Sequence, residues 1–111
     1  AREGNYLESS ATALFIYTLA KAVNKGYIGK DYIQPTRKAF DGMVKTFTRL
    51  EEDGSYTITN CCAVAGLGGD SKRYRDGSFE YYISEPVIEN DPKSVGSFIL
   101  AAIEYEKMTD K

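Results

Sequence analysis

Residues 9–23, SSATALFIYTLAKAV, decide the fold of this chain because they form a long apolar stretch with a single lysine as their formal charge. The length of the stretch and its lack of turn-forming residues favour a helix over a strand. Glu8, Ser9 and Ser10 offer side-chain oxygens for the unpaired N–H groups of a first turn, and Gly26 suits the helix end. A helix that is apolar on nearly every side is predicted to be buried on most faces.

Residues 35–47, PTRKAFDGMVKTF, predict a second helix of a different kind. Pro35 suits a first helical turn, where a missing N–H costs little. Apolar and charged positions fall on opposite faces at helical spacing, as in an amphipathic surface helix. The apolar face carries Phe40, Met43, Val44 and Phe47, and the charged face carries Arg37, Lys38, Asp41 and Lys45.

A small hairpin is predicted over residues 48–59 because Asp53-Gly54 is a turn signal between short alternating stretches. Residues 61–91 are predicted to form a long loop, since Gly, Asp and Ser are frequent there. A short helix or turn is expected near residues 78–84. Loops of this length are usually functional or disordered, and the tyrosines of this one argue against disorder.

A third long helix is predicted over residues 92–107, because Asp91 suits an N-cap and Pro92 suits the first helical position. Residues 95–103, VGSFILAAI, carry no charge, so this helix is also expected to be buried on most sides. One amphipathic helix cannot cover two apolar ones, so further protein must do so. The fold class is therefore mainly α, and the alternation is typical of a barrel of helical hairpins with buried inner and amphipathic outer helices.

Composition argues against several classes of function. The chain has 111 residues, a net charge of −2 and no His, and its basic residues are interleaved with acids, which is unlike a nucleic-acid-binding surface. No apolar run is long enough to span a membrane, and no leader-like N-terminal segment is visible. Cys61 and Cys62 are interpreted as free thiols, because two adjacent cysteines without His make neither a disulfide framework nor a zinc site.

Three blocks in order resemble the unsaturated rhamnogalacturonyl hydrolases, glycoside hydrolase family 105, which are related to the unsaturated glucuronyl hydrolases. The blocks are GNYLESSATALFIYTLAKAVNKGY (4–27), CCAVAGLGG (61–69) and RDGSFEYYISEPVIENDPKSVGSFILAAIEYE (75–106). The resemblance extends over nearly the whole chain. It implies the C-terminal part, roughly a third, of an (α/α)6 barrel.

The resemblance also implies a reaction. Members of this family remove the 4,5-unsaturated galacturonyl residue from the non-reducing end of pectin and rhamnogalacturonan oligosaccharides. An Asp protonates the ring double bond at C4, water adds at C5, and the resulting hemiketal collapses to release the sugar. No metal or organic cofactor takes part. The catalytic Asp lies earlier in the family barrel and no position here matches its motif, so the chain alone is expected to be inactive.

The candidate substrate-binding residues follow the loop and the start of the last helix, which line the cleft in such a barrel. Lys93 and Ser94 lie at a helix N-terminus, where N–H groups favour a uronate carboxylate, although Lys93 could equally be a solvated first-turn residue. Asp91 could bond a sugar hydroxyl, but N-capping explains it more simply. Tyr81 and Tyr82 could stack on a sugar ring, and at most one is expected to do so. Arg75 could reach a carboxylate, or could form a surface ion pair.

Two other interpretations remain open at this point. The chain could be a helical binding or oligomerisation module, or a fragment of another helical-barrel carbohydrate enzyme. The interpretation as a fragment of a pectin-degrading hydrolase has a physical consequence, because helices made for burial would leave apolar patches that drive self-association. The expected partner is an oligosaccharide, with no nucleic acid and no membrane. The sequence leaves the compartment of the parent open between bacterial cytoplasm and periplasm, and it leaves the exact uronyl substrate open.

Overall fold

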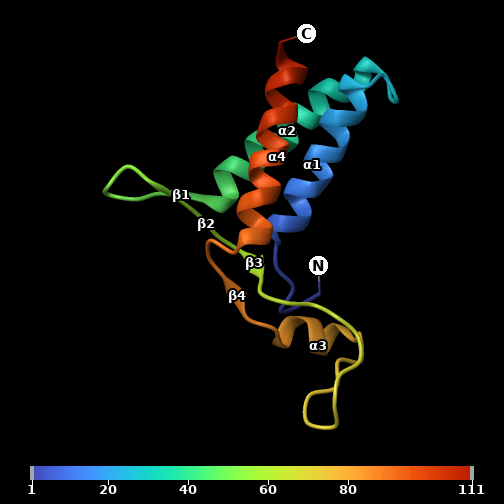
Figure 1. The fold of residues 1–111 in the computed structure, drawn as a ribbon, viewed down its shortest axis with the longest axis vertical. Coiled ribbons are helices and arrows are strands. Elements are labelled where there is room, and N and C mark those ends of the chain that lie inside the picture. Colours follow the sequence, from blue (N-terminus) through green and yellow to red (C-terminus); the bar gives the residue numbers. More distant parts are fainter. Residues whose placement is uncertain (1, 111) are drawn as a thin grey trace.

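The structure, a computed structural model, describes residues 2–110 as a bundle of long helices with short β-pairs and one short helix at one end (Figure 1). The helices are α1 (Ser9–Asn24), α2 (Ile33–Phe47), α3 (Phe79–Ser84) and α4 (Pro92–Thr109), with a 3-10 turn at Lys30–Tyr32 before α2. The strands are β1 (Thr48–Leu50), β2 (Tyr56–Ile58), β3 (Cys61–Cys62) and β4 (Val87–Ile88).

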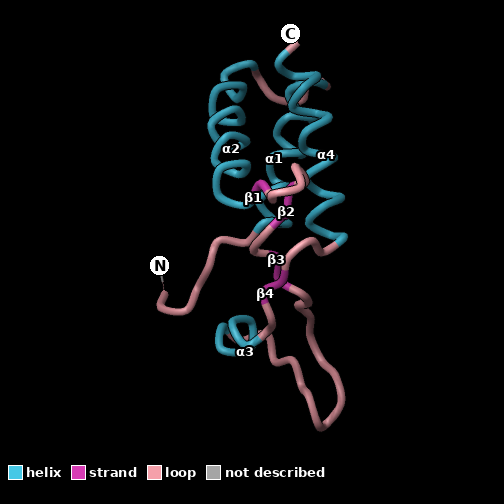
Figure 2. The backbone as a smooth tube through the Cα atoms, turned by 90° about the vertical axis from the view of Figure 1, so that its left-hand side faces the viewer, coloured by secondary structure: helices cyan, strands magenta, loops and turns pink. Residues whose placement is uncertain are grey.

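Helices α1 and α4 run side by side in the same direction, and α2 runs back along them (Figures 1 and 2). Their contact surface is made of small side chains, because Ala13, Ala20 and Ala101 are each fully buried. Small side chains let two helix axes approach closely. At the N-terminal ends the buried hydroxyls of Ser9 and Ser94 lie 2.7 Å apart and share a hydrogen bond. The two helices therefore begin beside one another.

Helix α2 packs against the α1–α4 pair and completes the core. Its apolar face places Met43 and Phe47 against Ile16 of α1, and all three are nearly fully buried. The Phe40 ring stacks on Tyr105 of α4, with ring centroids 3.9 Å apart. The predicted amphipathic helix is thus present, and its apolar stripe packs on the α1–α4 pair.

The helix ends use the residues that the sequence indicates. The Glu8 carboxylate accepts a hydrogen bond from the Ala11 N–H (2.7 Å) and caps α1. Gly26, with φ of +71°, ends α1 in a left-handed turn in which the Tyr27 N–H bonds the Ala22 carbonyl. Asp91 caps α4 by accepting a bond from the Lys93 N–H (2.8 Å). Local chemistry therefore sets where α1 and α4 begin.

The predicted hairpin is present, because β1 pairs antiparallel with β2 across the Asp53-Gly54 turn. The stretch 61–91 is more ordered than the prediction of an irregular loop. Within it β3 pairs antiparallel with β4, and α3 forms where a short helix was expected. Strands of two residues are too short to show the alternation by which strands are recognised in a sequence, so the prediction was wrong for β3 and β4.

The prediction that both apolar helices are buried on most faces is not met within this chain. Phe15 of α1 is 71% exposed and Ile99 of α4 is 55% exposed. Leu14, Leu100 and Ile103 are also exposed on the same two helices. The core provided by residues 2–110 covers only the faces that α1, α2 and α4 turn toward one another. No helix in this range is long and apolar enough to cross a membrane.

The Glu8 cap generates a prediction about stability and pH. Burial opposes ionisation of Glu8, but hydrogen bonds from the N–H groups of Ala11 and Cys62 and from Ser10 outweigh it and lower its pKa below the ordinary 4.5. A lowered folded pKa means that ionised Glu8 stabilises the fold above pH 4.5, and that this contribution disappears as the pH falls through the folded pKa. Glu8→Gln should therefore be less stable than the wild type at pH 7, with a gap that narrows below about pH 4.5.

Urea unfolding followed by circular dichroism at several pH values measures this gap. Glu52→Gln is the matched control, because Glu52 is an exposed glutamate in the β1–β2 turn. Stability curves of Glu8→Gln and the wild type that run parallel from pH 7 to pH 3 would contradict the prediction.

Candidate functional site

A hollow of about 340 Å³ lies where α1 and α4 begin. Four parts of the chain meet around it: the first turn of α1 with its cap, the first turn of α4, strand β3 with the residues after it, and α3 (Figure 1). The lining side chains are Glu8, Ser10, Ala11, Cys62, Ala65, Tyr82 and Lys93. Two helix N-termini face this end of the bundle, and each carries partial positive charge. The hollow therefore combines charged, hydroxyl and aromatic groups at the N-terminal ends of two helices.

Glu8 holds β3 against the start of α1. Its Oε1 accepts hydrogen bonds from the Cys62 N–H (3.0 Å) and from the Ser10 hydroxyl (2.8 Å). Among the described residues that line the hollow, Glu8 is the one carboxyl group. Because its pKa is lowered, it is ionised at neutral pH and has no proton to donate. Glu8 can accept hydrogen bonds here, but it is unsuited to act as a general acid.

Lys93 is the cation of the site. Its ammonium donates to Asp91 Oδ1 (2.8 Å) and to the Ala63 carbonyl (2.9 Å), and the bond to Asp91 raises the pKa of Lys93. An ammonium group has three N–H donors, so one remains for a ligand. The Lys93 side chain is 53% exposed. It is therefore fixed in place by two acceptors and is still accessible to an anion.

Tyr82 is the aromatic side chain that lines the hollow, and its ring stacks on the ring of Tyr6. The two rings are stacked, with centroids 5.6 Å apart and planes 4° from parallel. Burial, together with the nearby Cys62 thiol, raises the pKa of Tyr6, which keeps its hydroxyl neutral. Tyr6 was missed from the sequence, because nothing local connects a tyrosine near the N-terminus with one on α3.

Some predicted site residues have other roles in the structure. Ser94 is fully buried and bonded to Ser9, so it offers no surface to a ligand. Asp91 caps α4 and holds Lys93, which is the simpler of its two predicted roles. Tyr81 and Arg75 are absent from the lining of the hollow, and both lie near Glu85 instead. Of the six predicted residues, Lys93 and Tyr82 therefore line the hollow itself.

The two adjacent cysteines form strand β3. Cys61 and Cys62 are both free and buried, and burial raises the pKa of the Cys61 thiol. Within residues 2–110 no group of three or more His, Cys, Asp or Glu is arranged to hold a metal ion. The hollow itself is lined by one carboxylate, one ammonium group, one hydroxyl-bearing serine and one tyrosine, beside Cys62 and two alanines.

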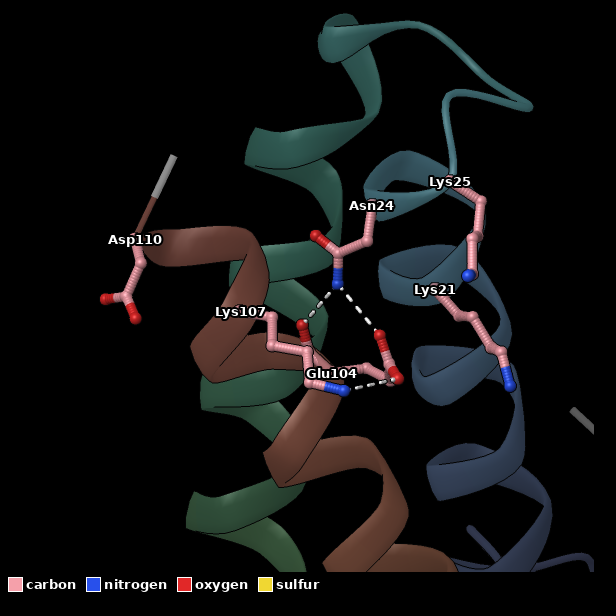
Figure 3. A pocket seen from close by; sticks show the side chains of 6 residues that line it. All are labelled: Lys21, Asn24, Lys25, Glu104, Lys107 and Asp110. Carbon is pink, nitrogen blue, oxygen red and sulfur yellow. Dashed lines mark hydrogen bonds and ion pairs between the residues drawn. The ribbon is translucent and has the colours of Figure 1, made fainter.

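A larger hollow, of about 580 Å³, lies at the opposite end of the helix pair (Figure 3). Its centre is occupied by an internal contact, because the Asn24 amide donates to both the carbonyl (2.8 Å) and the carboxylate (2.9 Å) of Glu104. Lys107 also bonds the Glu104 carboxylate (3.2 Å). Lysines near helix C-termini complement the negative end of the helix dipole. This hollow is explained by the way α1 is tied to α4, and we place the functional site at the other end.

Curated relatives match most of this chain. The chain is 39% identical over 105 residues to the protein Atu3128 of Agrobacterium fabrum and equally to the 24.9 kDa protein in the picA locus of Rhizobium radiobacter. Each match covers 91% of this chain and 45% of the relative. The chain therefore spans less than half the length of these relatives.

Solved structures and a family profile extend the comparison. The fold matches a family 105 glycoside hydrolase of C. acetobutylicum ATCC 824 with a TM-score of 0.91 and 44% identity, over 95% of this chain and 29% of that one. It matches a possible family 105 member from Salmonella enterica with a TM-score of 0.71 and 27% identity, over 98% and 25% of the two chains. The mainly helical fold is thus that of part of an α/α barrel. Because the profile of Glycosyl Hydrolase Family 88 matches residues 1–109, the chain belongs to that family of carbohydrate hydrolases.

Proposed function

We propose that this chain is the C-terminal part of a hydrolase that removes 4,5-unsaturated galacturonyl residues from pectin and rhamnogalacturonan oligosaccharides. Membership of the glycoside hydrolase family supports a carbohydrate substrate. The observation that carries the finer proposal is the hollow at the N-terminal ends of α1 and α4, where an accessible lysine and a tyrosine face one space. Uronyl sugars present a carboxylate and a flat ring face, which these two groups suit.

In this proposal each residue of the hollow has a separate task. The free N–H of Lys93 binds the uronate carboxylate as a charge-assisted hydrogen bond, and Asp91 keeps the ammonium in place. Tyr82 packs against the sugar ring, with Tyr6 behind it. Glu8 keeps Cys62 and the start of α1 together, which gives the hollow its shape.

Catalysis requires a further group. Double-bond hydration begins with protonation by a carboxylic acid, and ionised Glu8 cannot supply that proton at neutral pH. The family resemblance implies a catalytic Asp earlier in the barrel, and we propose that it lies in another part of the parent protein. We propose that the 111-residue chain contributes a wall of the substrate cleft and has no hydrolase activity alone.

A second candidate function is self-association of the isolated chain, as a helical oligomerisation module. The exposed apolar side chains of α1 and α4 favour it, since Phe15 and Ile99 are more than half exposed. Exposed apolar side chains promote association when they gather into large patches. A fragment of another helical-barrel carbohydrate enzyme would share the same exposed faces.

Lys93→Ala should weaken binding of an unsaturated galacturonyl disaccharide by about tenfold, because it removes a hydrogen bond between opposite charges. Isothermal titration calorimetry at low salt measures the affinity. Lys45→Ala is the matched control, because Lys45 is exposed on α2, away from the hollow. Equal affinities for the wild type and Lys93→Ala would rule out Lys93 as the carboxylate-binding group.

The isolated chain should form dimers or larger species at micromolar concentration, and the double variant Phe15→Glu/Ile99→Glu should shift it toward monomer. The reason is that the two substitutions place charges in the exposed apolar faces. Multi-angle light scattering after size exclusion gives the mass directly. A wild-type chain that is monomeric throughout the concentration range would exclude the oligomerisation module.

A further inference from the structure

Glu85 is the one charged residue among residues 2–110 that is buried, with 2% of its surface exposed. It follows α3 directly and ends that helix, with its N–H bonded to the Tyr82 carbonyl. A carboxylate loses its hydration when it is buried, and removing its cationic partner leaves that charge without compensation. The partners that keep Glu85 in this position therefore matter more than those of an exposed glutamate.

Those partners come from one loop. Arg73 Nη2 donates to Glu85 Oε2 over 2.7 Å, and Arg75 Nε lies 3.9 Å from Oε1. The loop is folded back on itself, because Gly68 and Arg75 exchange two backbone hydrogen bonds of 2.8 Å each. It projects beyond α3 at the end of the molecule (Figure 1). The buried carboxylate thus keeps its compensating charge only while this loop is folded against it.

The polar atoms around Glu85 Oε1 are only partly paired by hydrogen bonds. Glu85 Oε1, Arg75 Nε and the Tyr81 hydroxyl are buried and have no hydrogen-bond partner among the described residues. Burial and the Glu85 carboxylate together raise the pKa of Tyr81, so its hydroxyl stays protonated beside the carboxylate. The strong bond from Arg73 is therefore the contact on which Glu85 most depends.

Glu85 also lies between α3, which carries a residue of the hollow, and β4, which pairs with β3. The next residue, Pro86, accepts a hydrogen bond from the Ala63 N–H (2.9 Å), and β4 then pairs with β3. On its other side is α3, which carries Tyr82 into the hollow. A helix of six residues is not stable alone in water, so external contacts must hold α3. The Glu85 clamp, the Tyr6–Tyr82 stack and the β3–β4 pair are three such contacts.

We infer that Glu85 is a positioning residue, whose buried carboxylate is clamped by Arg73 and Arg75, fixes α3 and so holds Tyr82 in the hollow. It touches no ligand and acts through Tyr82. The placement of α3 is independent of the ligand, whereas the consequence for sugar binding rests on the proposed function. The two parts can therefore be tested separately.

Glu85→Gln preserves the shape of the side chain and removes its charge, so it separates ion pairing from packing. We expect trypsin to cleave after Lys72, Arg73 and Arg75 about tenfold faster than in the wild type, with faster hydrogen exchange in α3. Hydrogen exchange in α1 and α4 should not change. That result would distinguish a positioning role of Glu85 from general destabilisation of the fold. Glu52→Gln is the matched control, because Glu52 is an exposed glutamate in the β1–β2 turn, outside α3 and its loop. Mass spectrometry reads both experiments at low protein concentration.

Two substitutions of Arg73, the exposed partner of Glu85, test the same ion pair. Arg73→Lys preserves the positive charge and should stay near the wild-type cleavage rate, whereas Arg73→Gln should open the loop, as read from cleavage after Lys72 and Arg75. These variants decide the question if Glu85→Gln fails to fold, because Arg73 is 64% exposed and its substitution buries nothing new. Wild-type cleavage and wild-type α3 exchange in Arg73→Gln would overturn the inference.

Binding of the unsaturated galacturonyl disaccharide gives the final readout. We expect Glu85→Gln to bind it several-fold more weakly, and Glu52→Gln to bind it as the wild type does. An open loop with unchanged α3 exchange and unchanged affinity would overturn the positioning role. If the wild type does not bind the disaccharide at all, the proposed function fails, and the cleavage and exchange results still decide whether Glu85 fixes α3.

Discussion

The close, parallel contact between α1 and α4 is the constraint on which the rest of this structure depends. Fully buried alanines and the Ser9–Ser94 hydrogen bond let the two backbones approach and begin at the same level. Two positive helix ends are thereby brought to one place, and the residues that cap them, Glu8 and Asp91, come with them. The hollow lies at that place because of this geometry, and β3, α3 and Lys93 complete its walls.

The helices could be predicted because their signals are local. The Asp91-Pro92 start, the Gly26 stop and the amphipathic spacing of α2 each act within a few residues, and the structure has all three. The site was predictable only in part, since Lys93 and Tyr82 line the hollow whereas Ser94 and Arg75 face partners within the protein. Those partners, Ser9 and Glu85, lie elsewhere in the sequence, and the Tyr6–Tyr82 stack likewise joins distant positions. Long-range contacts of this kind leave no local pattern.

The polar groups at the two ends of the α1–α4 pair have different contacts. At the C-terminal ends, Asn24 and Lys107 engage Glu104 and tie α1 to α4, so the polar groups there are used internally (Figure 3). At the N-terminal ends, Lys93 keeps an unused donor beside Tyr82. The apolar faces of α1 and α4 remain exposed, in a chain that spans less than a third of the solved family 105 structures it matches. In our proposal, this chain contributes to substrate binding, whereas the catalytic acid lies in another part of the parent protein.

The measurement that tests this division most directly is the ultraviolet absorbance of an unsaturated rhamnogalacturonan disaccharide mixed with the purified chain. Hydration of the ring double bond removes its absorbance band, so the signal reports the reaction itself. Our account predicts a constant signal with this chain and a decreasing one with a full-length family 105 enzyme as the positive control. A decrease with this chain alone would place a catalytic acid within these residues and would contradict the assignment of the hollow to binding.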